Sequence, residues 1–76
     1  MPHLSPTPWQ TQVRVFEKYG CTFVRQSGSH LVYNHPQAKH PVIIPKYEEV
    51  LVTVIRTNMR TVGMTWEEYF ELLKGP

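Results

Sequence analysis

The chain contains no aspartate and only one cysteine. Aspartate carboxylates are among the commonest ligands of hard metal ions and among the commonest catalytic acids and bases. The single cysteine, Cys21, cannot form a disulfide within the chain, and we expect it to fill a small space in the core. These shortages argue against a fold stabilised by disulfides and against chemistry built on pairs of aspartates.

Long apolar runs are also missing. None approaches the roughly 20 residues that a membrane-spanning helix needs. The opening residues MPHLSPTP lack the charged and apolar regions of a secretory signal. With 76 residues the chain has room for one small domain. We therefore expect a soluble, cytoplasmic protein with no membrane partner, made of a flexible arm over residues 1–6 and one domain over residues 7–76.

Charge is unevenly distributed along the chain, although the formal net charge is only +2. Residues 1–47 contain five basic residues and one glutamate, for a net charge of +4. Residues 48–76 contain three basic residues and five glutamates, for a net charge of −2. A polyanion such as RNA would be attracted to the first part.

Cap residues and periodicity predict two helices. Thr7 followed by Pro8 is typical of an N-cap and a first helical turn, and we expect the helix that they open to end at Gly20. The next segment is ambiguous, because residues 50–55 also have strand propensity, but its periodicity predicts a second helix. Glu48 and Glu49 suit the N-terminus of this helix, and Gly63 is expected to end it. Its apolar stripe is predicted to contain Leu51, Ile55, Met59 and Val62.

A last helix is predicted by the capping box of Thr65 and Glu68. One face of this helix carries the apolar residues Trp66, Phe70 and Leu73. We expect this face to pack into the core rather than to form a groove for a partner.

Three short strands are predicted between the first two helices. Residues 22–27 and 30–35 are rich in aromatic and β-branched residues, and Gly28 and Ser29 between them are typical of a hairpin turn. Residues 41–45 predict a third strand, whose flanking prolines suit a sheet edge. The expected fold class is α+β: a three-stranded antiparallel sheet with helices packed on one face, in the order αβββαα.

The hairpin turn places a histidine at the start of the second strand. If Leu31 faces the helices, His30 points to the open face of the sheet. Gly28 would let a phosphate approach the backbone, Ser29 offers a hydroxyl, and Arg25 can neutralise charge. An imidazole can serve as acid or base near neutral pH, so these groups suit phosphodiester chemistry. The plain alternative is that Gly-Ser is only a good turn and His30 a tolerated strand residue.

A metal site is disfavoured by the same reasoning. His30, His35 and His40 are expected on opposite faces of the sheet or in turns, whereas a structural zinc site needs four convergent ligands. We therefore expect neither a metal ion nor another cofactor.

Three segments occur in an order and spacing that resemble one known family. They are CTFVRQSGSHLVYNHP with its R-Q-x-G-S-H corner, HPVIIP, and the closing GMTWEEYFELL. Together they resemble the HicA family of small mRNA interferase toxins from toxin–antitoxin pairs, over roughly residues 9–74.

The resemblance implies a double-stranded-RNA-binding-like fold, cleavage of mRNA without a metal, and neutralisation by a HicB-type antitoxin that covers the active site. The family's essential histidine corresponds to His30, and its small turn residues correspond to Gly28 and Ser29. Many members have a second histidine where this chain has Leu31, and a V-P-x-H ending to the third strand. Here that loop reads IIPKYEEV, and Lys46 replaces a second possible general acid.

The first hypothesis is therefore a metal-independent mRNA endoribonuclease, the toxin of a type II toxin–antitoxin system. His30 is its candidate catalytic acid or base, and its candidate substrate-binding residues are Gly28, Ser29, Arg25 and Lys46. Attack by the RNA's own 2′-hydroxyl would need no metal. The alternatives are a non-catalytic RNA-binding or degenerate toxin domain that keeps the antitoxin interface, and a domain that only binds proteins.

Overall fold

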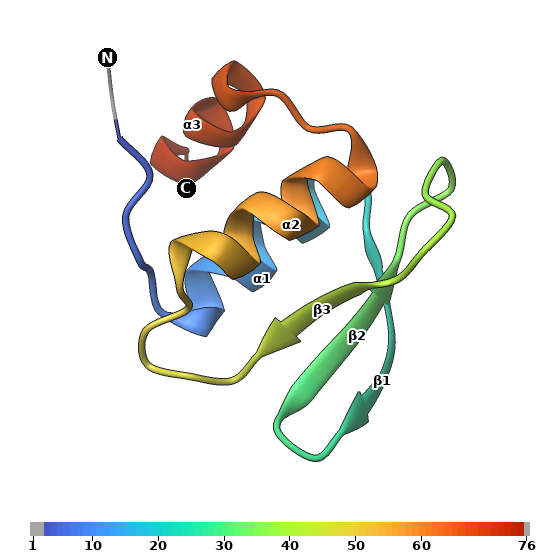
Figure 1. Ribbon diagram of the computed structural model, residues 1–76. Coiled ribbons are helices and arrows are strands. Elements are labelled where there is room, and N and C mark those ends of the chain that lie inside the picture. The colour runs from blue at the N-terminus through green and yellow to red at the C-terminus, as the bar shows by residue number, and fades with distance from the viewer. Residues whose placement is uncertain (1–2, 76) are drawn as a thin grey trace.

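The computed structural model describes residues 3–75, and its elements follow the predicted order. They are α1 (Trp9–Lys18), β1 (Thr22–Ser27), β2 (His30–Asn34), β3 (Val42–Pro45), α2 (Val52–Val62) and α3 (Trp66–Lys74). The strands form one antiparallel sheet in the order β1-β2-β3, which confirms the α+β prediction. The helices lie on one side of the molecule, and the β1–β2 hairpin extends beyond them (Figure 1).

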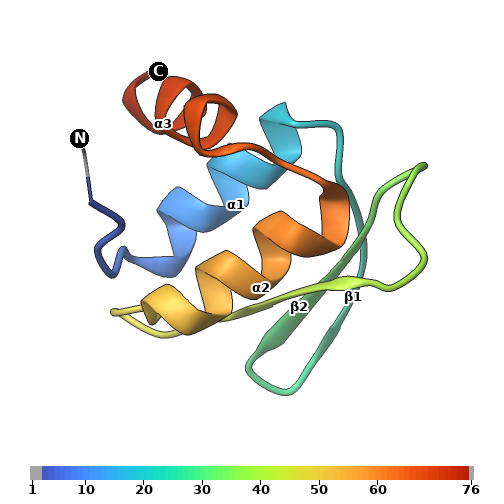
Figure 2. The same cartoon turned by 45° about the horizontal axis from the view of Figure 1, so that its top comes forward.

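The core lies between the helices and the inner face of β2 and β3. α1 contacts both β3 and α3, and α2 packs along β3. Figure 2 shows α3 on the side of α1 that faces away from the sheet. Leu31 and Tyr33 of β2 and Ile44 of β3 are buried in this core with Phe16 of α1. The alternation of β2 therefore confirms the prediction that Leu31 faces the helices.

β1 differs from the other two strands because all its residues are exposed. A bulge between Phe23 and Arg25 shifts its register, after which Arg25 lies opposite Val32 and Ser27 lies opposite His30. Gly28 has a φ of +59° and is the turn residue with positive φ, as in a type II′ hairpin turn. The predicted hairpin is thus confirmed, and its turn stands clear of the helices.

The start of α1 is held by the chain segment that precedes α2. Thr7 pairs with Val50 through two backbone hydrogen bonds, with N–O distances of 3.3 and 2.7 Å. Pro8 is the N-cap of α1, and no side chain caps this helix, so the predicted Thr7 cap is wrong. α2 begins only at Val52, so the prediction that Glu48 and Glu49 form its N-terminus is also wrong. In both places a long-range backbone pairing prevails over local helix signals.

The helix ends after Val50 agree better with the prediction. Gly63 ends α2 with a φ of +73°, which favours glycine. The capping box of α3 is present: the Thr65 hydroxyl accepts from the Glu68 amide at 3.1 Å, and the Glu68 carboxylate accepts from the Thr65 amide at 2.8 Å. No helix between residues 3 and 75 has the length and apolar character needed to cross a membrane.

The buried face of α2 is confirmed except for one residue, since Ile55, Met59 and Val62 are buried as predicted, whereas the buried face of α3 differs from the prediction. Leu51 is exposed, because it precedes the first turn of α2. In α3 the fully buried residue is Tyr69, whereas Trp66 is 43% exposed. The Tyr69 hydroxyl accepts a hydrogen bond of 2.9 Å from the buried Gln12 amide of α1. Because α3 has aromatic residues on several sides, its contact with α1 decides which one is buried.

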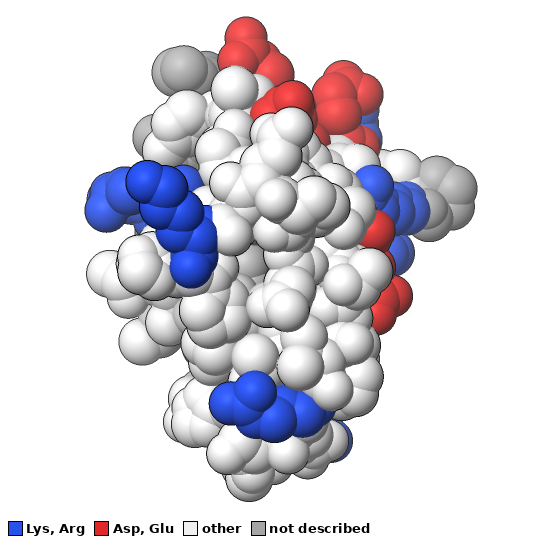
Figure 3. Space-filling model, turned by 90° about the vertical axis from the view of Figure 1, so that its right-hand side faces the viewer, with Lys and Arg blue, Asp and Glu red and all other residues white. Residues whose placement is uncertain are grey.

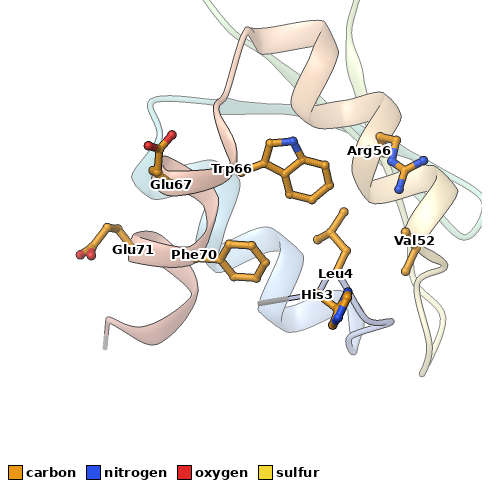
Figure 4. A pocket seen from close by; sticks show the side chains of 8 residues that line it. All are labelled: His3, Leu4, Val52, Arg56, Trp66, Glu67, Phe70 and Glu71. Atoms are coloured by element: carbon orange, nitrogen blue, oxygen red, sulfur yellow. The ribbon is translucent and has the colours of Figure 1, made fainter. Parts of the chain in front are cut away.

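A pocket of about 550 Å³ lies beside the exposed ring of Trp66, between α3, α2 and the N-terminal segment. Trp66, Phe70 and Leu4 point into it (Figure 4). The guanidinium of Arg56 lies 5.9 Å from the Trp66 ring centroid. The expectation that this aromatic face packs into the core is therefore wrong for Trp66, whereas Phe70 and Leu73 pack, partly buried, against the core. Leu4 is partly buried against the core, and the division into an arm and a domain at residue 7 stays a prediction.

Candidate functional site

His30 is the first residue of β2 and lies exposed on the outer face of the sheet, the face turned away from the core. It stands opposite Ser27 of β1 and Pro45 of β3. Its ring meets the ring of Tyr47 edge to face, with centroids 6.2 Å apart and an interplanar angle of 69°. The strand alternation that buries Leu31 thus leaves the imidazole of His30 open to a ligand.

A groove of about 510 Å³ extends from His30 between β3 and α2. The β3 side is formed by every second residue of this segment, Pro41, Ile43 and Pro45. The α2 side is formed by Thr53, Val54, Thr57, Asn58 and Thr61, and Tyr47 lies in the lining with His30.

Asn58 fixes the width of this groove. This residue is 5% exposed, and its Nδ2 donates a hydrogen bond of 2.8 Å to the carbonyl of Ile43. Ile43 and its partner Val32 form one pair of the β2–β3 ladder, so this bond attaches α2 to the free edge of β3. A buried and satisfied amide of this kind specifies a single arrangement of helix and strand.

The turn beside His30 is open to a ligand. No heavy atom lies within 4 Å of the position that a Cβ would occupy at Gly28. Ser29 is exposed, and its carbonyl accepts a hydrogen bond of 2.7 Å from the Lys46 amide. Arg25 is exposed and shares the outer face with His30 through the register of β1 and β2. Gly28, Ser29 and Arg25 are therefore all placed at or next to the face of the predicted histidine.

The side chain of Lys46 has a different neighbour. Its ammonium lies 5.0 Å from the ring centroid of Trp9, the first residue of α1. This cation–π contact directs the charge toward the helices rather than toward the outer face. The structure thus brings the backbone of Lys46 to the turn but not its charge to His30.

Tyr47 is the site residue that sequence reasoning missed. This residue is 51% exposed and lies beside His30. The signal was present in the V-P-x-H comparison: with the proline placed on Pro45, the histidine of that pattern falls on Tyr47, and Lys46 is the variable residue. The statement that Lys46 replaces a second possible acid is therefore wrong in position.

The surface charge supports the site near the hairpin. In Figure 3 a basic group lies at the bottom of the molecule, where the hairpin lies, other basic side chains lie at mid-height on both sides, and most glutamates lie at the top near α3. The groove lining itself contains no lysine, arginine or glutamate. A phosphate is thus favoured at the hairpin, and an uncharged group is favoured in the groove.

The remaining histidines and the cysteine take no part in this arrangement. Within residues 3–75, no three His, Cys, Asp or Glu side chains come together as a possible metal site. The His35 ring stacks on Tyr19 with centroids 5.4 Å apart. Cys21 is buried as predicted, and burial raises the pKa of its thiol to about 11. Burial, and then the hydrogen bond of 2.8 Å to the Glu17 carboxylate, raises the pKa of Tyr33.

Comparison with known proteins gives one family. A family model described as the HicA toxin of bacterial toxin-antitoxin matches residues 9–64. The match runs from the start of α1 to just beyond α2, so it includes His30 and Tyr47 and ends before α3. No curated protein matches the chain.

Proposed function

The chain belongs to the HicA family of toxins of toxin–antitoxin systems, and from this premise we propose that it is a metal-independent mRNA endoribonuclease with His30 as its catalytic residue. The observation that carries the proposal is an exposed imidazole next to a turn with free space at Gly28. A phosphate could approach the backbone of this turn without displacing any side chain.

The proposed reaction uses the RNA's own 2′-hydroxyl as nucleophile. His30 takes its proton while the 2′ oxygen attacks phosphorus. The bond from phosphorus to the 5′ oxygen breaks, and that oxygen is protonated by solvent. The products are a 2′,3′-cyclic phosphate and a 5′-hydroxyl, and DNA, which lacks the 2′-hydroxyl, is not cut.

Charge on the phosphate is assigned to the hairpin residues. Ser29 offers its hydroxyl beside His30, and Arg25 shares the outer face. We assign stabilisation of the developing negative charge to Arg25 rather than to Lys46, because the Lys46 ammonium lies over Trp9. Of the two basic residues that the sequence offered for this role, Arg25 and Lys46, the assignment keeps Arg25.

The family implies an antitoxin partner, and we propose that it is of HicB type and covers the outer face around His30. Because the exposed Arg25 lies on the hairpin, the partner would present acidic groups there, and its affinity would fall with added salt. Titration calorimetry at rising salt concentration measures this dependence. The proposed substrate, mRNA, places the protein in the cytoplasm.

Expression of the chain without an antitoxin tests the toxin activity. Wild-type protein should arrest growth, and His30→Ala at the same protein level should restore it. His40→Ala is the matched control, since His40 is an exposed histidine of the β2–β3 connection that does not line the groove. Growth arrest that persists with His30→Ala would contradict the role of His30.

Cleavage and binding assays on purified protein test the mechanism. His30→Ala should cleave RNA about 10²- to 10⁴-fold more slowly, while its RNA affinity stays within a few-fold of wild type. Wild-type cleavage should persist in excess EDTA. A loss on chelation that a divalent ion reverses would overturn the 2′-hydroxyl mechanism. RNA binding without any cleavage would favour the alternative of a degenerate, non-catalytic toxin domain.

A further inference from the structure

The groove between β3 and α2 has no part in the chemistry proposed for His30. We propose that it binds one unpaired RNA base, stacked on Tyr47, next to the phosphate that is cleaved. This inference rests on the proposed function, since it takes the ligand of the neighbouring His30 to be RNA. It makes Tyr47 the residue that restricts the substrate to single strands.

Tyr47 has the exposure and the rigidity of a stacking platform. Tyr47 is 51% exposed, lines the groove, and has its ring edge to face with the His30 ring. Two hydrogen bonds hold the backbone at Tyr47. The Trp9 amide donates to the Tyr47 carbonyl at 3.2 Å, and the amide of the preceding residue, Lys46, donates to the Ser29 carbonyl at 2.7 Å. A ring held in this way loses little freedom when a base stacks on it.

The groove itself suits an uncharged, planar ring. Its β3 side is apolar, and no charged lysine, arginine or glutamate lines it. Its volume of about 510 Å³ lies within the usual range for small-molecule sites. A phosphate would find no counter-charge inside, whereas a base would replace water on apolar surface.

The α2 side adds hydrogen-bond acceptors. The Thr57 hydroxyl donates to the Thr53 carbonyl at 2.9 Å, and the Thr61 hydroxyl donates to the Thr57 carbonyl at 3.0 Å. Each of these hydroxyl oxygens keeps lone pairs that can accept from the N–H groups of a base. The groove thus offers an aromatic face at one end and acceptors along one side.

The arrangement predicts a preference for single strands. A base in a duplex is stacked and paired, and its edge and faces are not available to Tyr47 and the groove. A flexible strand can turn one base out at little cost. The substrate class is therefore RNA that is unpaired at the cleavage site.

The test measures binding rather than cleavage. A fluorescein-labelled single-stranded RNA of mixed sequence, and the same strand annealed to its complement, are titrated with His30→Ala protein and followed by anisotropy. The single strand should bind more tightly than the duplex. Adding Tyr47→Ala should weaken single-strand binding about 5- to 150-fold, the range measured for loss of one stacked base, and leave duplex binding unchanged.

Two further variants distinguish the loss of the Tyr47 ring from the loss of its hydroxyl and from the loss of an exposed aromatic ring elsewhere. Tyr47→Phe keeps the ring and should restore the affinity that Tyr47→Ala loses. Trp66→Ala is the matched control, because Trp66 is a similarly exposed aromatic residue that does not line the groove. Circular dichroism is used to check that each variant is folded.

Several results would overturn the proposal: unchanged single-strand affinity with Tyr47→Ala, equal losses with Tyr47→Ala and Tyr47→Phe, or equal affinity for single strand and duplex. Because binding is measured without cleavage, the two proposals can fail separately. If wild-type protein cuts no RNA while Tyr47→Ala still loses single-strand affinity, the stacking site stands and the nuclease does not. If cleavage depends on His30 while Tyr47→Ala binds normally, the nuclease stands and the stacking site does not.

Discussion

The helical side of the molecule and the β1–β2 hairpin differ in how they are held. The helical side contains the largest fully buried side chains, among them Tyr69, Phe16 and Ile55, whereas every residue of β1 is exposed. The hairpin carries Arg25 and His30, together with the turn between them. The helical side therefore provides most of the stability, and the hairpin carries the candidate catalytic groups. The inner face of β2 connects the two regions.

This separation explains how a domain of 76 residues can leave polar groups exposed at a site. A small domain has little stability to spare, and burying or straining catalytic groups would draw on it. Here the inner face of β2 contributes Leu31 and Tyr33 to the core, while His30 faces outward on the same strand. Substitutions on the two sides should thus separate stability from activity.

The largest effect on stability is expected from the core. Tyr69→Ala should lower the free energy of unfolding by about 3–5 kcal/mol, as for other buried aromatic residues, because it removes a fully buried ring. It also leaves the Gln12 amide with Thr7 as its remaining hydrogen-bond partner. Urea unfolding measures the change. Tyr69→Phe is the control and should lower the free energy of unfolding by only about 1 kcal/mol. A smaller decrease than this for Tyr69→Ala would contradict the view that stability resides on the helical side.

Burial of Cys21 in the core should make the stability of the protein depend on pH. Burial raises the pKa of the Cys21 thiol from 9.0 to about 11, so the folded state favours the protonated thiol. Its contribution to stability is complete below pH 9 and is lost as the pH rises through about 11, because the unfolded chain ionises first. Thiol labelling of the native protein near pH 8 should be about 100-fold slower than in urea.

Unfolding midpoints of wild type and Cys21→Ala across this pH range provide the control. The difference between the two proteins should shrink as the pH rises from 9 to 11. Rapid labelling of the native protein would show that Cys21 is accessible, contrary to its burial in the core.

A change in the hairpin turn should be smaller and local. Gly28→Val forces a β-branched residue to a φ of +59°, which costs about 1–2 kcal/mol, although nothing lies within 4 Å of the added Cβ. Amide exchange should rise in β1 and at the start of β2, and RNA cleavage should fall. Gly28→Asn is the matched control, since asparagine tolerates this region better. Faster amide exchange throughout the helices of Gly28→Val would contradict the proposed separation of the stable helical side from the hairpin.

The smallest effect is expected at the start of α3. Thr65→Ala removes the capping hydroxyl that accepts from the Glu68 amide, and should cost about 1 kcal/mol in urea unfolding. RNA cleavage should not change, because α3 lies outside the groove and outside the family match. Thr22→Ser on β1 is the control, because Thr22 is a threonine that does not line the groove. Altered cleavage with Thr65→Ala would show that α3 takes part in the site.

Much of the fold could be predicted because its signals are local. The Gly28 turn, the Gly63 helix end and the Thr65 capping box each depend on a few neighbouring residues. The alternation that exposes His30 follows from strand geometry alone. Such features need no information about the rest of the chain.

The errors in the predicted fold involve residues that are far apart in sequence. The pairing of Thr7 with Val50 removed a predicted cap and shortened α2. Contact with α1 selected Tyr69, and not Trp66, as the buried ring of α3. Local patterns leave such choices undecided because several faces are apolar enough to be buried.

The candidate site was likewise predicted in part. Its turn residues and His30 came from one continuous segment, whereas the groove requires α2 to lie against β3 through Asn58 and Ile43. The V-P-x-H pattern pointed to position 47, but the contact of Tyr47 with His30 is known only from the structure.

By itself the sequence determined the order of helices and strands, the hairpin corner with its outward histidine, and the family to which the chain belongs, because each of these is written in short, contiguous patterns. Only the tertiary structure decided that Lys46 turns to Trp9, that Tyr47 stands beside His30, and that a groove opens between β3 and α2. The physical reason is that side-chain contacts between distant segments depend on how the elements pack, and packing is a property of the whole core.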